Sequence, residues 1–138
     1  MIKKLSSTRI NNTSVHLSLL ILRLVSGGFM LSHGIPKLLR MLEGDFRFAD
    51  PLGLGSGVSL IMAVFAEVVC ALLIVVGLGT RLASIPLIVT MAVAAFISHG
   101  SDPFARKELA LFYLAGYFIL LLLGSGKYSF DNYFRFKK

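Results

Sequence analysis

The sequence has few of the residue patterns that build catalytic or redox centres. It contains one cysteine, Cys70, so a single chain can form neither an internal disulfide nor a CxxC dithiol centre. It has no HxxxH or HExxH spacing, no glycine-rich phosphate loop, no dinucleotide-binding fingerprint and no nucleophile elbow. Only 15% of its residues are charged. Cys70 stands inside an apolar run, and we interpret it as a packing residue.

Long hydrophobic runs dominate what is present. Hydrophobic residues form 56% of the chain, and the mean hydropathy is +0.81. These residues form continuous stretches instead of the single stripe of an amphipathic helix, which is typical of a membrane protein. A helix needs roughly 20 apolar residues to cross a bilayer. The sequence therefore predicts an all-α fold, a four-transmembrane-helix bundle with spans near 15–36, 56–78, 82–100 and 108–126.

The segments outside these spans give the predicted organisation. The first connection, 37–54, is long and carries charges of both signs, and a short interfacial segment through Phe46 and Phe48 is expected in it. A tight glycine-rich turn at 77–81 joins the second and third spans. The predicted parts are a cytoplasmic N-terminal tail at 1–14, a four-helix membrane domain at 15–133 and a basic C-terminal tail at 134–138.

The net charge of +7 fits a membrane protein better than a nucleic-acid-binding protein, because no DNA- or RNA-binding motif accompanies it. An even number of spans places both termini on one side of the membrane. That side carries more basic residues than the other, which favours a multi-pass protein of the cytoplasmic membrane with both termini in the cytoplasm. The basic residues on the side of the termini are Lys3, Lys4, Arg9, Arg81, Lys127, Arg135, Lys137 and Lys138.

Two opposite charges stand inside predicted spans. Arg23 lies near the middle of the first and Glu67 near the middle of the second. A charge at membrane depth is costly and normally finds a partner. The two backbones differ by roughly 5 Å in depth, so an ion pair between Arg23 and Glu67 is expected. Such a pair either fixes helix packing alone or takes part in function.

Further ionisable groups are predicted to converge near the outer surface. His33 and Lys37 end the first span, His99 ends the third, and Glu108 begins the fourth. Together they predict an outward-opening polar pocket above Arg23 and Glu67. Histidine can relay protons or ligate metal. Two histidines without a metal-binding spacing disfavour a metal or haem site, and no metal is expected.

These residues, in this order, resemble the DoxX family of small four-helix membrane proteins. The resemblance covers about 20–133. It implies membership of a family whose name comes from a membrane subunit associated with thiosulfate:quinone oxidoreduction, and other members are linked to thiol and oxidative-stress homeostasis. The pattern consists of Arg23-Leu24, Gly27, His33-Gly34, Lys37-Leu38, Glu67, Gly77-Leu78-Gly79-Thr80-Arg81, Glu108, Gly124-Ser125-Gly126-Lys127-Tyr128-Ser129 and Asp131.

The first functional hypothesis is therefore a membrane subunit of a quinone-linked oxidoreductase or of a thiol and oxidative-stress system. His33, Lys37 and Glu108 would donate hydrogen bonds to a quinone headgroup, and Glu67 would relay protons. A protein partner would supply the redox centre. The alternatives are a non-enzymatic scaffold or assembly factor and a small proton-coupled transporter using Glu67, which would have to dimerise. The sequence decides neither enzymatic activity nor oligomeric state.

Overall fold

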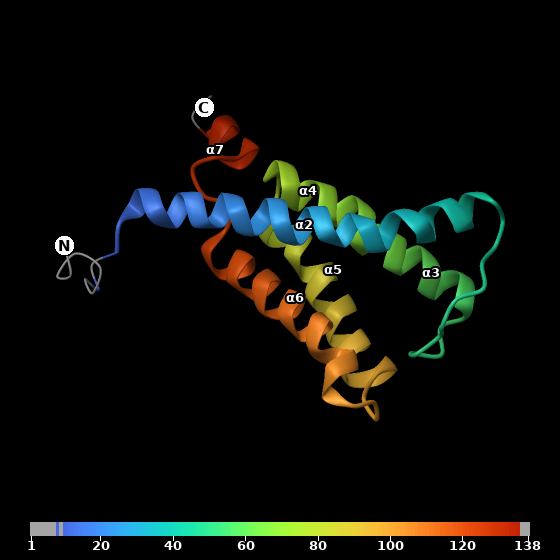
Figure 1. The fold of residues 1–138 in the computed structure, drawn as a ribbon. Helices are drawn as coiled ribbons and strands as arrows, with labels where there is room; N and C mark the ends of the chain where they lie inside the picture. Colours follow the sequence, from blue (N-terminus) through green and yellow to red (C-terminus); the bar gives the residue numbers. More distant parts are fainter. Residues whose placement is uncertain (1–7, 9, 136–138) are drawn as a thin grey trace.

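The computed structural model describes residue 8 and residues 10–135, and every regular element in this part is helical (Figure 1). The predicted tails at 1–14 and 134–138 lie partly outside the described residues. In chain order the elements are α2 (Asn12–Leu42), α3 (Ser56–Val64), η1 (Phe65–Cys70), α4 (Ala71–Val76), α5 (Thr80–Val93), η2 (Ala94–Ser98), α6 (Phe104–Leu123) and α7 (Phe130–Arg135).

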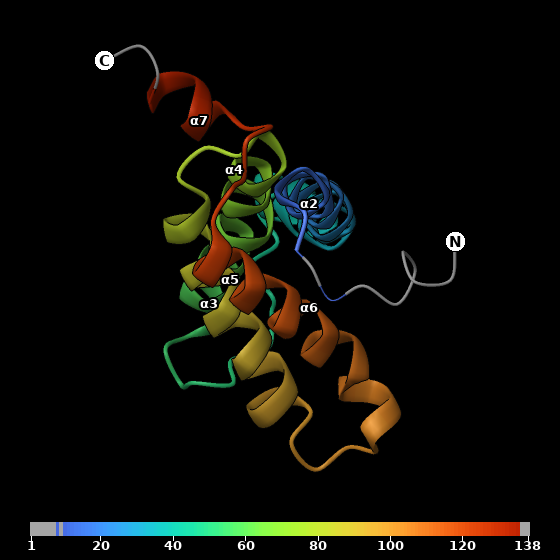
Figure 2. The same ribbon diagram turned by 90° about the vertical axis from the view of Figure 1, so that its left-hand side faces the viewer.

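These elements form four long rods and one short terminal helix. The rods are α2, then α3–η1–α4, then α5–η2, then α6. The start of α2 lies at the same end of the bundle as α7, and α5 and α6 diverge from α2 toward the opposite end (Figures 1 and 2). The first three rods, Asn12–Leu42, Ser56–Val76 and Thr80–Ser98, are long and apolar enough to cross a membrane. The fourth, α6, has 20 residues and packs along α5. The predicted four-helix bundle is thus confirmed.

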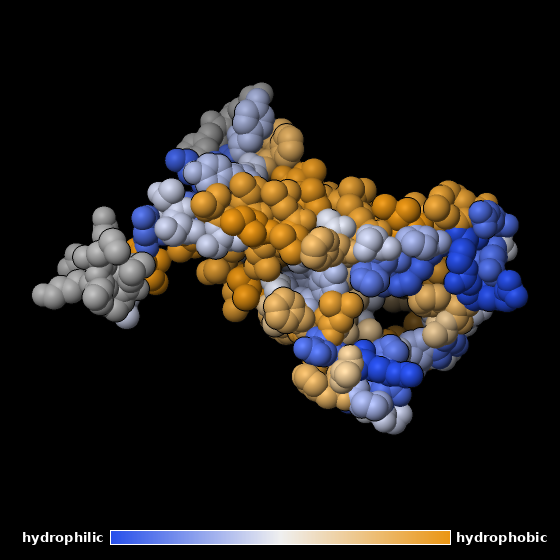
Figure 3. All heavy atoms as spheres, in the orientation of Figure 1, coloured by the Kyte–Doolittle hydropathy of each residue, from blue (hydrophilic) through white to orange (hydrophobic). Residues whose placement is uncertain are grey.

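The surface of the bundle suits lipid, because large apolar side chains point outward along every rod. Phe29 is 63% exposed, Phe112 81% and Leu122 71%. Hydrophobic residues cover most of the α2 side in the space-filling view (Figure 3). Inside, Leu60, Ile74 and other side chains are fully buried. An apolar exterior with a packed interior is the arrangement that a bilayer selects.

The first helix is longer than predicted. It runs to Leu42 and continues past Pro36, which removes one helical hydrogen bond. Leu38 and Met41, beyond the proline, pack against the buried cluster of Leu60, Val64 and Val68. This packing carries the helix onward, so the predicted boundary near residue 36 was wrong.

The connection after α2 holds no helix, and the expected interfacial position of Phe46 and Phe48 stays a prediction. Two carboxylates shape this loop instead. Asp45 accepts hydrogen bonds from the Arg47 backbone and side chain. Asp50 accepts from the backbone N–H groups of Leu54 and Gly55 just before α3. These carboxylates accept hydrogen bonds from backbone N–H groups that helical hydrogen bonds would otherwise satisfy.

Two rods contain π-helical turns, which hydropathy did not reveal. η1 interrupts the second rod and carries Glu67, and η2 ends the third rod just before His99. A π turn widens the helix and rotates the following side chains, and it is frequent at functional sites. Both π segments therefore mark places where side-chain direction has been adjusted.

Two glycines of α2, Gly27 and Gly34, let the first two rods approach closely. A Cβ atom added to Gly34 would lie 2.6 Å from the Glu67 carbonyl oxygen. One added to Gly27 would lie 2.7 Å from Val75 Cγ2. A side chain at Gly34 would have to displace the backbone of the second rod, and one at Gly27 would have to displace the Val75 side chain. Gly34 thereby places α2 directly against the π turn that carries Glu67.

Candidate functional site

Arg23 and Glu67 are not partners, and the pairing expected from the sequence was wrong. The Arg23 guanidinium is bound by four main-chain carbonyl groups. Glu67 is bound by Lys37. The prediction failed because it weighed side-chain charges alone, whereas the carbonyls at a helix C-terminus are also good partners for a cation.

The Arg23 side chain joins the end of α4 to the segment after α6. It donates to Ile74 O at 2.9 Å and Val75 O at 2.9 Å, both in the last turn of α4. It also donates to Ser125 O at 2.8 Å and Tyr128 O at 2.7 Å, in the segment after α6. Arg23 is only 1% exposed. Since its donors are taken up by main-chain oxygens, Arg23 is a structural residue in this fold.

Asp131 makes further hydrogen bonds at the same end of the bundle. Its carboxylate accepts from Gly79 N at 2.7 Å and from Thr80 N at 3.3 Å, which satisfies the first donors of α5. Its backbone N–H donates to Gly77 O at 2.9 Å. The glycine-rich turn at 77–81 and the segment at 124–131 are therefore joined in space. Several residues that carried the family resemblance serve here to close the bundle.

The charged pair with functional promise is Lys37 and Glu67. Lys37 Nζ lies 2.7 Å from Glu67 Oε1 and 2.5 Å from Oε2. The Glu67 side chain is 5% exposed and that of Lys37 is 26% exposed. The ammonium also lies 5.6 Å from the centre of the Phe48 ring, within cation–π range. The pair is thus largely withdrawn from water, with its basic partner on the open side.

This pair lines a cavity of about 420 Å³. The cavity lies between the loop end of α2, the 48–54 loop, α3 and the far end of α5, and Figure 3 shows the surface hollowed there. Its wall is mostly apolar, with a few polar groups around the ion pair. The apolar members include Phe48, Leu52, Leu54, Met62, Val89 and Val93, and the polar ones are Lys37, Ser59, Glu67, Thr90, Ser98 and His99.

Both π segments contribute to this wall. Glu67 belongs to η1, while Ala94 and Ser98 belong to η2. His99 follows η2, and its Nδ1 lies 2.8 Å from Asp102 Oδ2. This hydrogen bond is the main reason that the pKa of the Asp102 carboxyl lies below its ordinary value. The cavity wall thus holds two polar groups of note, the partly exposed His99 and the ion pair at Glu67.

The remaining predicted residues are placed elsewhere. His33 is exposed on α2, and its ring meets that of Tyr113 on α6 edge-on, with 6.1 Å between centroids. Glu108 is exposed on α6. Neither His33 nor Glu108 lines the Lys37–Glu67 cavity. The structure therefore brings together Lys37, Glu67 and His99, and their roles with a quinone stay predictions.

Sequence reasoning selected Lys37 but missed its partner. The signal was present in Gly34, which lies three residues before Lys37 and hence on the same face of α2. A glycine there allows close approach of the second rod, and Lys37 then follows one turn beyond the contact. The cavity itself could not be read from the sequence, because it depends on the divergence of α5 from α2.

The chemistry of the cavity is that of a site for a small amphipathic molecule. Apolar walls bind rings or chains, and a few polar groups fix orientation. Lys37 has three N–H donors, and Glu67 occupies only part of that capacity. Among the described residues, no group of three or more His, Cys, Asp or Glu side chains is placed to hold a metal ion.

Comparison with known proteins gives a consistent family result. A model of the DoxX family matches residues 18–100. The chain is 34% identical over 128 residues to an uncharacterized protein of Haemophilus influenzae, covering 85% of this chain and 90% of that protein. It is 30% identical over 140 residues to an uncharacterized membrane protein of Mycobacterium tuberculosis, covering 83% and 80%. No solved structure matches the chain significantly.

Proposed function

This chain belongs to the DoxX family of membrane proteins, and we propose that it binds the headgroup of a membrane quinone in the Lys37–Glu67 cavity. In this proposal it is the membrane subunit of a quinone-linked oxidoreductase. The observation that carries the proposal is an ion pair set in the wall of a mostly apolar cavity of about 420 Å³. A quinone headgroup needs such a setting, because it is a flat apolar ring with two hydrogen-bond-accepting oxygens.

Lys37 is the residue that orients the headgroup. Its ammonium holds Glu67 and keeps a further N–H for a quinone carbonyl oxygen. The Phe48 ring beside it and Met62, which also lines the cavity, offer apolar surface to the quinone ring. A substrate carbonyl that accepts from a cation is polarised toward reduction.

Glu67 provides the proton path. Reduction of a quinone to a quinol takes two electrons and two protons, and the electrons come from a partner protein that is itself oxidised. Lys37 can pass a proton to the reduced oxygen and recover one through Glu67, to which it is already hydrogen-bonded. His99 also lines the cavity, is partly exposed and is paired with Asp102, so it would connect this path to solvent.

The orientation proposed with this function places both chain termini in the cytoplasm, so that the cavity opens toward the outer half of the membrane. The basic residues around the termini support it. Cysteine labelling tests it, since the sole native cysteine, Cys70, is buried. An impermeant maleimide should label Arg106→Cys in intact cells, and Lys127→Cys only after lysis. The reverse pattern would contradict the orientation.

Binding of a short-chain quinone to the purified protein tests the function. Lys37→Met and Glu67→Gln should each weaken binding at least about tenfold, which corresponds to about 1.4 kcal/mol for one charged hydrogen bond. Glu43→Gln is the matched control, because Glu43 is an exposed carboxylate that caps α2 outside the cavity. Equal binding by all three variants, or no binding by the native chain, would contradict the proposal. It would favour a scaffold role, to be sought as a co-purifying protein.

A further inference from the structure

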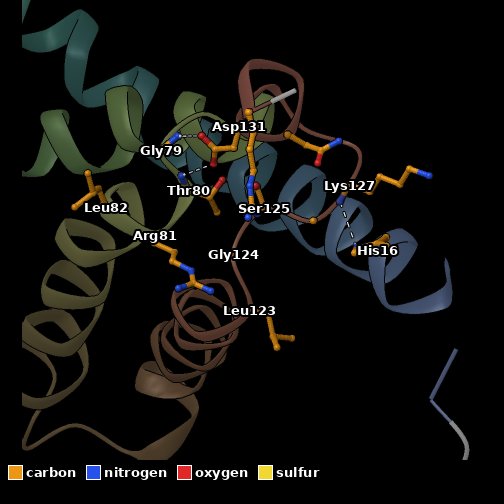
Figure 4. Close-up of a pocket in the computed structure, with 13 residues that line it drawn as sticks. His16, Gly79, Thr80, Arg81, Leu82, Leu123, Gly124, Ser125, Lys127 and Asp131 are labelled. Atoms are coloured by element: carbon orange, nitrogen blue, oxygen red, sulfur yellow. Dashed lines mark hydrogen bonds between the residues drawn. The ribbon is translucent and has the colours of Figure 1, made fainter. Parts of the chain in front are cut away.

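A second cavity lies at the opposite end of the bundle, beside the starts of α2 and α5 and the short helix α7. Its volume is about 690 Å³. Three basic side chains line it: Arg81 at the start of α5, Lys127 after α6, and Arg135 at the end of α7. His16 of α2 lines it too (Figure 4). This end is remote from Lys37 and Glu67, and the quinone proposal makes no use of it.

We propose that this cavity binds the phosphate headgroup of an anionic phospholipid, whose acyl chain lies in an adjoining apolar groove between α2 and α6. The site is independent of the quinone site. Anionic phospholipid would then be a specific ligand of the protein, and not only part of the surrounding bilayer.

The charge balance of the cavity favours an anion. Asp131 is the one acidic residue among its lining residues, and its carboxylate is already engaged by the backbone N–H groups of Gly79 and Thr80. In Figure 4 Asp131 points at this turn. Arg81, Lys127 and Arg135 therefore leave the cavity with a net positive charge. Each such residue near a membrane surface favours an anionic lipid.

The polar groups are also held ready to donate. Arg81 Nη2 donates to Leu122 O at 3.1 Å, which fixes the guanidinium beside Gly124 and leaves its other N–H groups for a ligand. The backbone N–H of Lys127 donates to His16 Nδ1 at 3.3 Å, so the His16 proton belongs on Nε2, where it can be donated. Arginine suits phosphate oxygens through its planar fork of donors.

The apolar groove can hold an acyl chain of the phospholipid. It has a volume of about 570 Å³ and runs between α2 and the last turns of α6. Leu123 lines both the groove and the basic cavity, so the two adjoin. Most of the groove wall is apolar, including Val15, Leu19, Leu22 and Ile119. A basic cavity at the end of a helical membrane bundle, adjoined by a mostly apolar groove, offers room for both the headgroup and an acyl chain of a phospholipid.

Native mass spectrometry of the full chain in detergent tests this site, with phosphatidylglycerol and phosphatidylcholine as probes. We expect retention of phosphatidylglycerol over phosphatidylcholine. Lys127→Gln should weaken phosphatidylglycerol retention roughly fivefold, the effect of one charge at a membrane surface. Arg106→Gln, which removes one positive charge at the opposite end, should leave retention unchanged. Among the described residues, the hydrogen bond of Lys127 is made by its backbone N–H, so this substitution should leave the fold intact, and thermal unfolding checks that it does.

Two further experiments test where the acyl chain binds and whether the bound phosphate belongs to a lipid. Ser18→Trp fills the groove and should lower retention of the lipid, while binding of water-soluble glycerophosphoglycerol stays the same. Inorganic phosphate should fail to displace the lipid. Equal retention of both lipids, equal effects of Lys127→Gln and Arg106→Gln, or displacement by inorganic phosphate would each overturn the proposal.

Discussion

Lys37 Nζ lies 2.7 Å from Glu67 Oε1 and 2.5 Å from Oε2, so the ammonium at the end of one membrane helix neutralises a carboxylate at the middle of the next. The contact depends on Gly34, whose lack of a side chain brings α2 against the Glu67 backbone. It also depends on the π turn η1, from which Glu67 projects. The Lys37–Glu67 ion pair therefore depends on helix packing, and it also sets the chemistry of the cavity.

The first prediction separates these two contributions. Lys37→Met leaves the Glu67 carboxylate buried without its cation, and should lower the free energy of unfolding by about 3 kcal/mol. The double variant Lys37→Met/Glu67→Gln removes the charge as well and should recover most of that loss. Unfolding in detergent measures both. A double variant no more stable than the single one would show that the two residues are not coupled.

The second prediction concerns the close approach of the first two rods. Gly34→Ala places a Cβ atom 2.6 Å from the Glu67 carbonyl oxygen and should cost about 2 kcal/mol, because the backbone there cannot yield locally. Gly28→Ala is the control, since nothing lies within 4 Å of its Cβ position, and it should be neutral or slightly stabilising. Similar unfolding temperatures for the two variants would contradict this packing.

The third prediction distinguishes a clash from backbone strain at the turn after α4. Gly77 has φ of 73°, and an added Cβ would lie 2.5 Å from Arg23 Nη2. Gly79 has φ of 58°, and its Cβ position is open. Gly79→Ala should therefore cost about 1 kcal/mol for the left-handed conformation alone.

Gly77→Ala carries the same strain and in addition displaces the Arg23 guanidinium from its four carbonyl partners. It should cost at least about 2 kcal/mol more than Gly79→Ala. Unfolding in detergent compares the two. Equal losses would mean that Arg23 moves aside freely, and that its hydrogen bonds contribute little to the fold.

The fourth prediction is a pH dependence in the loop before α3. Hydrogen bonds, first of all from the Gly55 N–H, lower the pKa of Asp50 below its ordinary value of 3.8. Because the folded pKa is the lower one, the stabilisation is complete above the ordinary value and is lost as the pH falls through the folded pKa. The amide resonances of Leu54 and Gly55 should therefore titrate together, at a midpoint below 3.8. Asp50→Asn should abolish this titration, and a midpoint above 3.8 would contradict the assignment.

Hydropathy was enough to predict the bundle, because the bilayer imposes a length and a composition on each rod. The second span, predicted at 56–78, is observed at Ser56–Val76, and the third, predicted at 82–100, at Thr80–Ser98. The helix α7 was not predicted, because its six residues mix aromatic and charged side chains and form no apolar run. The end of α2 was missed because packing against Leu60 overrides the local effect of Pro36.

The site was predicted less well than the fold. The two charges inside the predicted spans, Arg23 and Glu67, were recognised as costly, and both are engaged by partners. The choice of partner depends on which backbone carbonyls are left free at the end of α4, and on how π turns rotate the second rod. Neither the free carbonyls at the end of α4 nor the π turns can be recognised from the spacing of apolar residues in the sequence. The cavity depends on the splay between α2 and α5, which is a property of the assembled bundle.

The most direct measurement is photolabelling of the native chain with an azido-quinone, followed by mapping of the modified peptides. The account predicts labels in the 48–54 loop and in α3–η1, which line the Lys37–Glu67 cavity. Lys37→Met should reduce labelling, Glu43→Gln should leave it unchanged, and excess unlabelled quinone should abolish it. Labels spread along the lipid-facing helices, or insensitive to Lys37→Met, would contradict a quinone site in this cavity.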